Sequence, residues 1–345
     1  MRAGLFAIAL TFATSCAAAA AGVGFRDPWP EVPETAGEAV RVASLSPFVP
    51  RDIGEGAPAA TAQVTWFAPA GAGHARKAPA VVLLHGAGGV VASREITYAR
   101  QLAAMGIGAA VVDVFAARRD LATSFADRII EITETMALAD AYATLGWLSR
   151  RPEIDAARVA LWGFSYGAMS SIYATNAAIA DRLAEAFTLG ATRFAAHIAF
   201  YGPCITTFDN DRTTGAPVLM AWGAADELIN AERCRALADD LRNGGSTVQT
   251  IVYPGAYHQW DGGWIGPRRI GRLLDGCEFR VSNDLVVRAG GLGFPMTNPF
   301  TRKLILAFCV GSDGYLMGRD DAVRERSNRD VAAFLARALR LAPPG

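Results

Sequence analysis

The chain has 345 residues, 52% of them hydrophobic, and its 33 lysines and arginines balance 33 aspartates and glutamates. This length and apolar content are typical of a folded protein with a large buried core, which excludes a disordered tail. A net charge of zero provides no overall field to attract nucleic acid or an anionic membrane. We therefore expect a small-molecule partner and no nucleic acid.

The first 21 residues are typical of a secretory signal peptide. Arg2 supplies the positive charge, residues 5–13 form an apolar stretch, and the alanines at 17–21 offer A-x-A cleavage sites. The apolar stretch is shorter than the roughly 20 residues that span a membrane. We expect a periplasmic or secreted protein with no stable membrane insertion after signal removal. Cys16 leaves lipid anchoring as an alternative.

An N-terminal arm at 22–60, either an extended segment or an edge strand, precedes a regular alternation of apolar and helical stretches. In chain order we predict strands at 61–67 and 80–84, a helix at 93–104, a strand at 109–115, a helix at 126–150, a strand at 158–163, a helix after residue 167, strands at 195–202 and 216–223, a helix at 231–243, a strand at 247–254 and a helix at 320–341. Near-continuous apolar strands separated by helices indicate a mostly parallel sheet covered on both faces. The sequence therefore predicts one α/β domain at 61–345.

The motif G-F-S-Y-G at residues 163–167 joins an apolar strand to a predicted helix. In such a strand-to-helix turn, flanking glycines relieve crowding and the serine hydroxyl is lifted out of the sheet. Active residues of parallel sheets lie just past the carboxyl ends of the strands. We predict that Ser165 is a catalytic nucleophile.

A serine hydroxyl becomes nucleophilic when a base accepts its proton and a third group orients that base. His258 follows the last predicted strand in Y-P-G-A-Y-H, at the same end of the sheet, and is the predicted base. His197 lies within the apolar stretch A-A-H-I-A-F and is interpreted as a core histidine.

The acid is expected between the serine and the histidine in chain order. Asp226 comes directly after the strand P-V-L-M-A-W and is the predicted acid, with Glu227 as the nearest alternative. Asp261 follows the base too closely to orient it, and we interpret it as a solvated loop charge.

An oxyanion hole requires backbone N–H groups directed at the developing negative charge. Tyr166, after the nucleophile, supplies the first. The strand A-V-V-L-L continues into H-G-A-G-G at 85–89, so Ala87 is the candidate for the second, with Gly86 as the neighbouring option and His85 shaping the loop. These glycines fail the G-x-G-x-x-G spacing, so we expect no dinucleotide cofactor.

Four cysteines remain after the signal peptide, and an even number in an oxidising compartment predicts two disulfides. We pair Cys204 with Cys234, because both lie near the same sheet end, and Cys277 with Cys309, because they share one segment. No pair has C-x-x-C spacing and no histidine is close in sequence, so we expect no metal.

Residues 262–312 interrupt the alternation between the last strand and the last helix, and they are too many for a simple connection. Because the segment begins just after His258, we expect an insertion that caps the active site. Its apolar side chains would line the pocket: Trp264, Phe279, Leu292, Phe294 and Phe300. A peripheral excursion on the outside of the sheet is the alternative.

With these motifs the chain resembles the dienelactone-hydrolase-like branch of the α/β-hydrolases. The matching pieces are H-G-A-G-G, V-V-D-V-F, G-F-S-Y-G, W-G-A-A-D and Y-P-G-A-Y-H, spread over residues 79–260. The resemblance implies the α/β-hydrolase fold, a mostly parallel sheet with helices on both faces, with an insertion before the last helix. It also implies hydrolysis of an ester or lactone through an acyl-enzyme, without metal or organic cofactor.

One position departs from the founding members, which carry cysteine in G-x-C-x-G where this sequence has Ser165. A serine needs the full base and acid pair, whereas a cysteine is nucleophilic as its thiolate. We therefore expect a carboxylesterase-type activity on a small ester or lactone. Two alternatives stay open, a peptidase of the same fold and a non-catalytic binding protein of the cell envelope.

Overall fold

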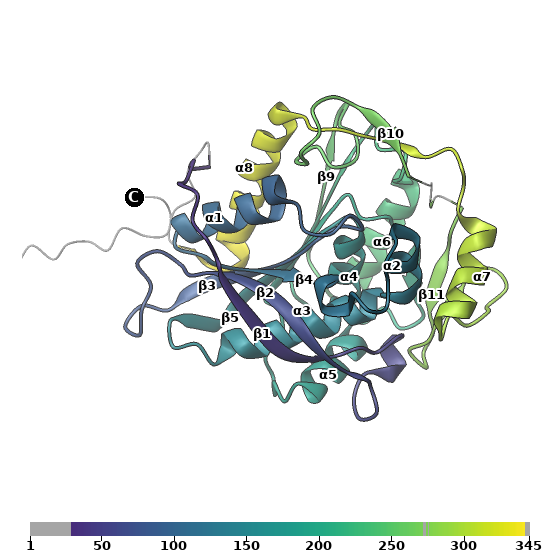
Figure 1. Cartoon of the computed structure of the whole chain (residues 1–345), viewed down its shortest axis with the longest axis horizontal. Helices are drawn as coiled ribbons and strands as arrows, with labels where there is room; N and C mark the ends of the chain where they lie inside the picture. Colours follow the sequence, from purple (N-terminus) through teal and green to yellow (C-terminus); the bar gives the residue numbers. More distant parts are fainter. Residues whose placement is uncertain (1–28, 272–273, 275, 342–345) are drawn as a thin grey trace, which may run out of the picture.

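The computed structural model describes residues 29–271, 274 and 276–341 (Figure 1). The predicted signal peptide at 1–21, with Cys16, lies outside the described residues. Eight strands form the central sheet: β1 (Glu38–Leu45), β2 (Ala59–Phe67), β3 (Ala78–Leu84), β4 (Gly108–Asp113), β5 (Ile154–Phe164), β6 (Ala196–Phe200), β8 (Val218–Gly223) and β9 (Val248–Tyr253). Their spatial order is β1-β2-β4-β3-β5-β6-β8-β9.

The sheet is parallel except at β2, which pairs antiparallel with both of its neighbours. All residues of β3 are buried, as expected for a strand covered on both faces. Val82 and Leu84 point into one core and Val81 and Leu83 into the other, because successive side chains of a strand alternate between faces.

Helices cover both faces of the sheet: α1 (Thr97–Ala104), α2 (Phe125–Glu131), α3 (Glu134–Ser149), α4 (Tyr166–Tyr173), α5 (Ala177–Ala186), α6 (Ala231–Asn243), α7 (Pro299–Cys309) and α8 (Asp321–Ala338). Helices α3, α4 and α5 pack with the sheet in one core, while α1 and α8 pack on the other face. This arrangement confirms the predicted α/β-hydrolase fold.

The single helix predicted at 126–150 is divided into α2 and α3. Ile132 has an extended backbone, and the Thr133 hydroxyl accepts a hydrogen bond from the N–H of Met136 and so caps α3. The break leaves the carbonyl of Ile132 free of the helix, and the hydroxyl of Tyr166 donates to it at 2.6 Å. The interruption therefore ties α3 to the first residue of α4.

The N-terminal arm contributes the edge strand of the sheet. β1 forms its edge and pairs along its whole length with β2, and Trp29 is buried in the core beneath α1. Burial of this indole ties the beginning of the described chain to the domain, since an aromatic side chain contributes a large apolar area to a core.

Within its described residues, the insertion at 262–312 contains three short strands and one helix. They are β10 (Arg268–Ile270), β11 (Phe279–Val281), β12 (Val287–Ala289) and α7, and β13 (Tyr315–Met317) follows the insertion. β11 pairs antiparallel with β12 and parallel with β7 (Thr206–Phe208), and β10 pairs antiparallel with β13. Figure 1 places α7 and β11 at one end of the molecule, near α2. A buried ion pair between Arg302 and Glu134 joins α7 to α3.

Two disulfides join Cys204 to Cys234 and Cys277 to Cys309, the pairs that the sequence analysis expected. The paired residues are 30 and 32 positions apart, separations for which chain-entropy estimates give about 3–4 kcal/mol each. Such cross-links are typical of an oxidising compartment outside the cytoplasm. No helix within the described ranges is both long and apolar enough to cross a membrane.

Candidate active site

The turn between β5 and α4 holds Ser165 in an unusual backbone conformation. Its φ is 52°, in the left-handed region that side chains other than glycine rarely adopt. A Cβ on Gly163 would lie 2.0 Å from the carbonyl oxygen of Gly167, and one on Gly167 would lie 2.2 Å from that of Leu84. Both flanking positions therefore require glycine, which is the physical reason for the G-x-S-x-G pattern.

Ser165, His258 and Asp226 lie in one hydrogen-bonded series. The Ser165 hydroxyl is 2.9 Å from Nε2 of His258, and Nδ1 of His258 is 2.7 Å from Oδ2 of Asp226. All three residues are buried. With Nδ1 donating to the carboxylate, Nε2 is free to accept the serine proton.

The two candidate acids point in different directions. Asp226 accepts the backbone N–H of Leu228 with Oδ1, which leaves Oδ2 for the histidine. Glu227 instead forms an ion pair with Arg269 at 2.9 Å and accepts the N–H of Leu316. A hydrogen bond from Arg269 lowers the pKa of Glu227. Of these two acidic residues, only Asp226 contacts the histidine.

Two tyrosine rings flank the imidazole of His258. The rings of Tyr201 and Tyr315 lie 4.9 and 5.0 Å from it, at 67° and 83°. The main chain of His258 donates to the carbonyl of Leu316 and accepts from the N–H of Gly318. Burial, together with the charge of Asp226, raises the pKa of Tyr315 to about 12, so its hydroxyl stays protonated at neutral pH. The sequence pattern contains no local signal for either tyrosine.

Asp261 is fully buried, so its interpretation as a solvated charge is wrong. Its carboxylate accepts hydrogen bonds from the hydroxyls of Tyr98 at 3.0 Å and Tyr201 at 2.6 Å. Tyr98 comes from α1 and Tyr201 follows β6, and the fold brings both to the loop after β9. The pKa of each tyrosine is raised, first by burial and then by the negative charge of Asp261.

The H-G-A-G-G loop lies against the nucleophile. A Cβ on Gly86 would be 3.3 Å from that of Ser165. Nδ1 of His85 donates to the carbonyl of Gly86 at 2.7 Å, and its Nε2 accepts the N–H of Val114 at 3.1 Å. These roles require a neutral ring, and burial lowers the pKa of His85 accordingly. The loop that carries Ala87 is thus held beside the turn that carries Tyr166.

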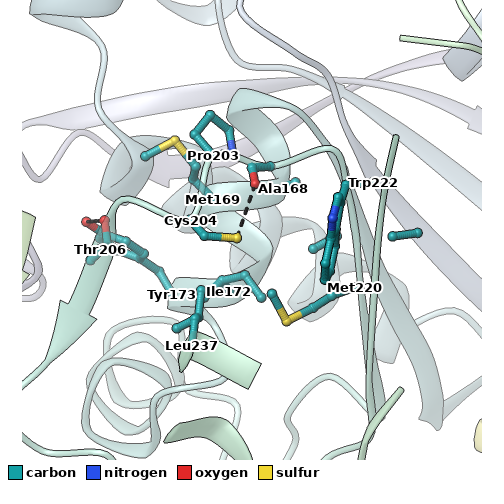
Figure 2. A pocket seen from close by; sticks show the side chains of 13 residues that line it. Ala168, Met169, Ile172, Tyr173, Pro203, Cys204, Thr206, Met220, Trp222 and Leu237 are labelled. Carbon is teal, nitrogen blue, oxygen red and sulfur yellow. Dashed lines mark hydrogen bonds between the residues drawn. The ribbon is translucent and has the colours of Figure 1, made fainter. Parts of the chain in front are cut away.

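An apolar cavity lies beside α4 (Figure 2). Its walls come from α4, the segment after β6, the end of β8 and one residue of α6, and they include Met169, Ile172, Pro203, Met220, Trp222 and Leu237. A wider groove of about 660 Å³ shares Cys204, Thr206 and Leu237 with this cavity and is lined on its other side by residues 289–293 of the insertion. The cavity is apolar but holds only about 20 Å³, whereas the groove also carries charged side chains. Neither is lined by Ser165, Asp226 or His258.

The described residues bring no three His, Cys, Asp or Glu side chains together as metal ligands. The parallel sheet and the Ser–His–Asp series at its carboxyl edge define the protein as an α/β-hydrolase. The model of the dienelactone hydrolase family matches residues 64–261, more than half of the chain. The chain belongs to this family and is a hydrolase acting on ester bonds.

The chain is similar to solved structures of low sequence identity. The dienelactone hydrolase-like promiscuous phosphotriesterase P91 from metagenomic libraries is 19% identical, with 89% of this chain and 100% of that chain covered and a TM-score of 0.51. The native esterase Est2 of the Planctomycetes species Thermogutta terrifontis is 17% identical, with 68% and 86% covered and a TM-score of 0.48. At 19% identity the likeness to P91 shows the fold alone. A comparison with curated proteins gave no match.

Proposed function

We propose that the protein cleaves a carboxylic ester or lactone through an acyl-enzyme, with Ser165 as nucleophile, His258 as base and Asp226 as acid. The observation that carries the proposal is the buried hydrogen-bonded series of these side chains at the end of a strained turn. Membership of the dienelactone hydrolase family favours an ester bond over a peptide bond.

In the proposed reaction the Ser165 oxygen attacks the carbonyl carbon while its proton moves to Nε2 of His258. The carboxylate of Asp226 stabilises the resulting imidazolium. The N–H groups of Ala87 and Tyr166 stabilise the oxyanion of the tetrahedral intermediate. When that intermediate collapses, the proton passes from His258 to the departing alkoxide oxygen. Water then attacks the acyl-enzyme by the same steps, releasing the acid and the free serine.

We further propose that the acyl group extends toward the apolar cavity beside α4 and into the groove that adjoins it. Three walls of the cavity come from segments that lie close in sequence to the proposed catalytic residues or to the residues that contact them. The N–H groups of Ala168 and Met169 donate to the carbonyl of Ser165, Pro203 follows shortly after the β6 end that contacts His258, and Trp222 shortly precedes Asp226.

A fluorophosphonate probe tests the proposed function directly. Because such reagents phosphonylate activated serines, we expect one covalent adduct per chain, located on the peptide that contains Ser165. Intact-mass and peptide mass spectrometry measure the stoichiometry and the position. A folded protein that takes up no label, or takes it up at another residue, would contradict the proposal and favour a non-catalytic binding protein.

Residues 1–21 are proposed to be a signal peptide that directs the protein to the periplasm or the exterior. The support comes from elsewhere in the chain, because both disulfides need an oxidising compartment to persist.

We propose that residues 262–312 form a wall of the substrate site rather than a lid of apolar side chains. Phe279 packs in the main core, and Leu292, Phe294 and Phe300 are 82%, 61% and 75% exposed. The insertion still borders the site, because a Cβ on Gly263 would lie 3.1 Å from the hydroxyl of Ser93, just after the H-G-A-G-G loop. The ion pair of Arg269 with Glu227 secures it beside the acid.

Leu292→Trp tests this wall. The side chain lines the groove at residues 289–293, so a larger ring should obstruct long acyl chains while leaving acetate esters unaffected. We expect kcat/KM for a long-chain p-nitrophenyl ester to fall on the order of 10-fold relative to the acetate. Leu121→Trp is the matched control, since Leu121 is also exposed but lines a different surface groove. An unchanged chain-length profile in Leu292→Trp would mean that the insertion does not border the acyl site.

A further inference from the structure

A buried ion pair lies directly after the loop proposed to form the oxyanion hole. Nε of Arg94 is 2.7 Å from Oε1 of Glu95, and the two side chains are 1% and 0% exposed. Adjacent residues of a regular α-helix do not face each other. Here they occupy η2 (Ala92–Ile96), a π-helical turn. Removing two charges from water is costly, so such a pair persists where further contacts compensate.

Glu95 connects the pair to the loop. Its second carboxylate oxygen, Oε2, accepts the backbone N–H of Val91 at 2.8 Å. The N–H of Arg94 donates to the carbonyl of Val91 at 3.0 Å. Glu95 therefore holds Val91, two residues after the H-G-A-G-G loop, with the same carboxylate that binds the guanidinium.

Arg94 connects the ion pair to the turn between β5 and α4 that carries Ser165. Its guanidinium lies over the ring of Phe164, 5.2 Å from the centroid, and Phe164 immediately precedes Ser165. Nη2 of Arg94 is 3.8 Å from the position of a Cβ on Gly86, the position that is also 3.3 Å from Cβ of Ser165. The guanidinium thus lies between Gly86 of the H-G-A-G-G loop and the turn that carries Ser165.

The charge of Arg94 also faces the loop that carries the proposed base. Burial alone would lower its pKa, but the negative charges of Glu95 and Asp261 outweigh this and raise it, so the guanidinium stays charged. Nη1 is buried without a hydrogen-bond partner among the described residues. Arg94 is therefore held by its ion pair and its stacking contact rather than by a complete set of hydrogen bonds.

We propose that Arg94 and Glu95 are positioning residues that set the distance between the two donors of the oxyanion hole, the N–H of Ala87 and that of Tyr166. The N–H of Ala87 belongs to the loop that ends just before Val91, which Glu95 holds. The N–H of Tyr166 lies in the turn that follows Phe164, against which Arg94 packs. The inference rests on the proposed function. Because an oxyanion forms only in the transition state, misplacing a donor lowers kcat and leaves KM nearly unchanged.

Glu95→Gln and Arg94→Lys test the proposal with p-nitrophenyl acetate as substrate. We expect kcat to fall on the order of 10- to 100-fold with KM within about twofold of the parent, since losing one donor outright costs about 10²–10³. The double variant Arg94→Met/Glu95→Leu removes both charges, and we expect it to regain thermal stability but not kcat. If a single variant does not fold, the double variant supplies the kinetic measurement.

Asp140→Asn is the matched control. Asp140 pairs with Arg118 at 2.6 Å, and the two side chains are 0% and 2% exposed. Its carboxylate also accepts the hydroxyl of Ser44, so the pair joins α3 to β1, at the edge of the sheet remote from the triad. We expect a fall in Tm comparable to that of Glu95→Gln with kcat preserved. Equal kcat in parent, Glu95→Gln and the double variant would overturn the inference and leave the pair as a core contact. Failure of the parent to react with the fluorophosphonate would instead overturn the proposed function.

Discussion

Ser165→Ala is expected to lower kcat for a short p-nitrophenyl ester by about 10⁵- to 10⁶-fold, to the level that the remaining oxyanion hole and binding site support. The substitution removes the oxygen proposed to form the acyl-enzyme and leaves Nε2 of His258 without its hydrogen-bond donor. Steady-state kinetics with freshly purified protein measures the loss, and the absence of a burst of p-nitrophenol reports the missing acylation step.

Ser170→Ala provides the control for this variant. Ser170 is a buried serine on the same helix, α4, and its hydroxyl has no hydrogen-bond partner among the described residues. The same chemical change there should preserve kcat within about twofold, because no group of the triad is touched. If Ser165→Ala retained the parent rate, the assignment of the nucleophile would be wrong.

Asp226→Asn is expected to reduce kcat by about 10⁴-fold, as the loss of a carboxylate that orients the histidine does in serine hydrolases. The 2.7 Å contact between Oδ2 and Nδ1 of His258 requires an acceptor when Nδ1 carries its proton. An asparagine amide can donate there and favour the tautomer that places the proton on Nε2. The serine would then lose its base, which kcat measured from about pH 6 to 9 should show as a uniform deficit.

Glu227→Gln tests whether Asp226 or Glu227 acts as the acid. The Glu227 side chain is paired with Arg269 and accepts the N–H of Leu316. Neutralising it weakens the ion pair between the loop that carries Asp226 and the insertion, but it leaves the hydrogen bonds of Ser165, His258 and Asp226 unchanged. We expect kcat within about threefold of the parent, because exposed ion pairs contribute little. A large loss in Glu227→Gln together with a small one in Asp226→Asn would reverse the assignment.

Local patterns were sufficient to predict the sheet and the places where the candidate residues lie. Apolar strands alternating with helices require parallel strands, and their carboxyl ends then meet at one edge. Ser165, Asp226 and His258 each follow a different strand of that kind, so their proximity could be expected from the order of the elements alone. The glycines around Ser165 were equally informative, because the tight turn they permit has a direct steric cause.

The choice between Asp226 and Glu227 depended on the tertiary structure, since both follow the same strand and only packing decides which carboxylate turns toward the histidine. The burial of Asp261 is a second case, because its tyrosine partners come from α1 and the end of β6. A third is Tyr315, which the pairing of β10 with β13 brings against the imidazole.

By itself, then, the sequence determined the fold class and the strand ends that carry the candidate nucleophile, base and acid, because these depend on periodicity and on turns formed by neighbouring residues. Only the tertiary structure decided which polar groups meet. The contacts of Arg94 with Phe164 and of Asp261 with Tyr201 join segments distant in sequence. Such contacts arise from the packing of whole elements, which a local pattern of residues does not predict.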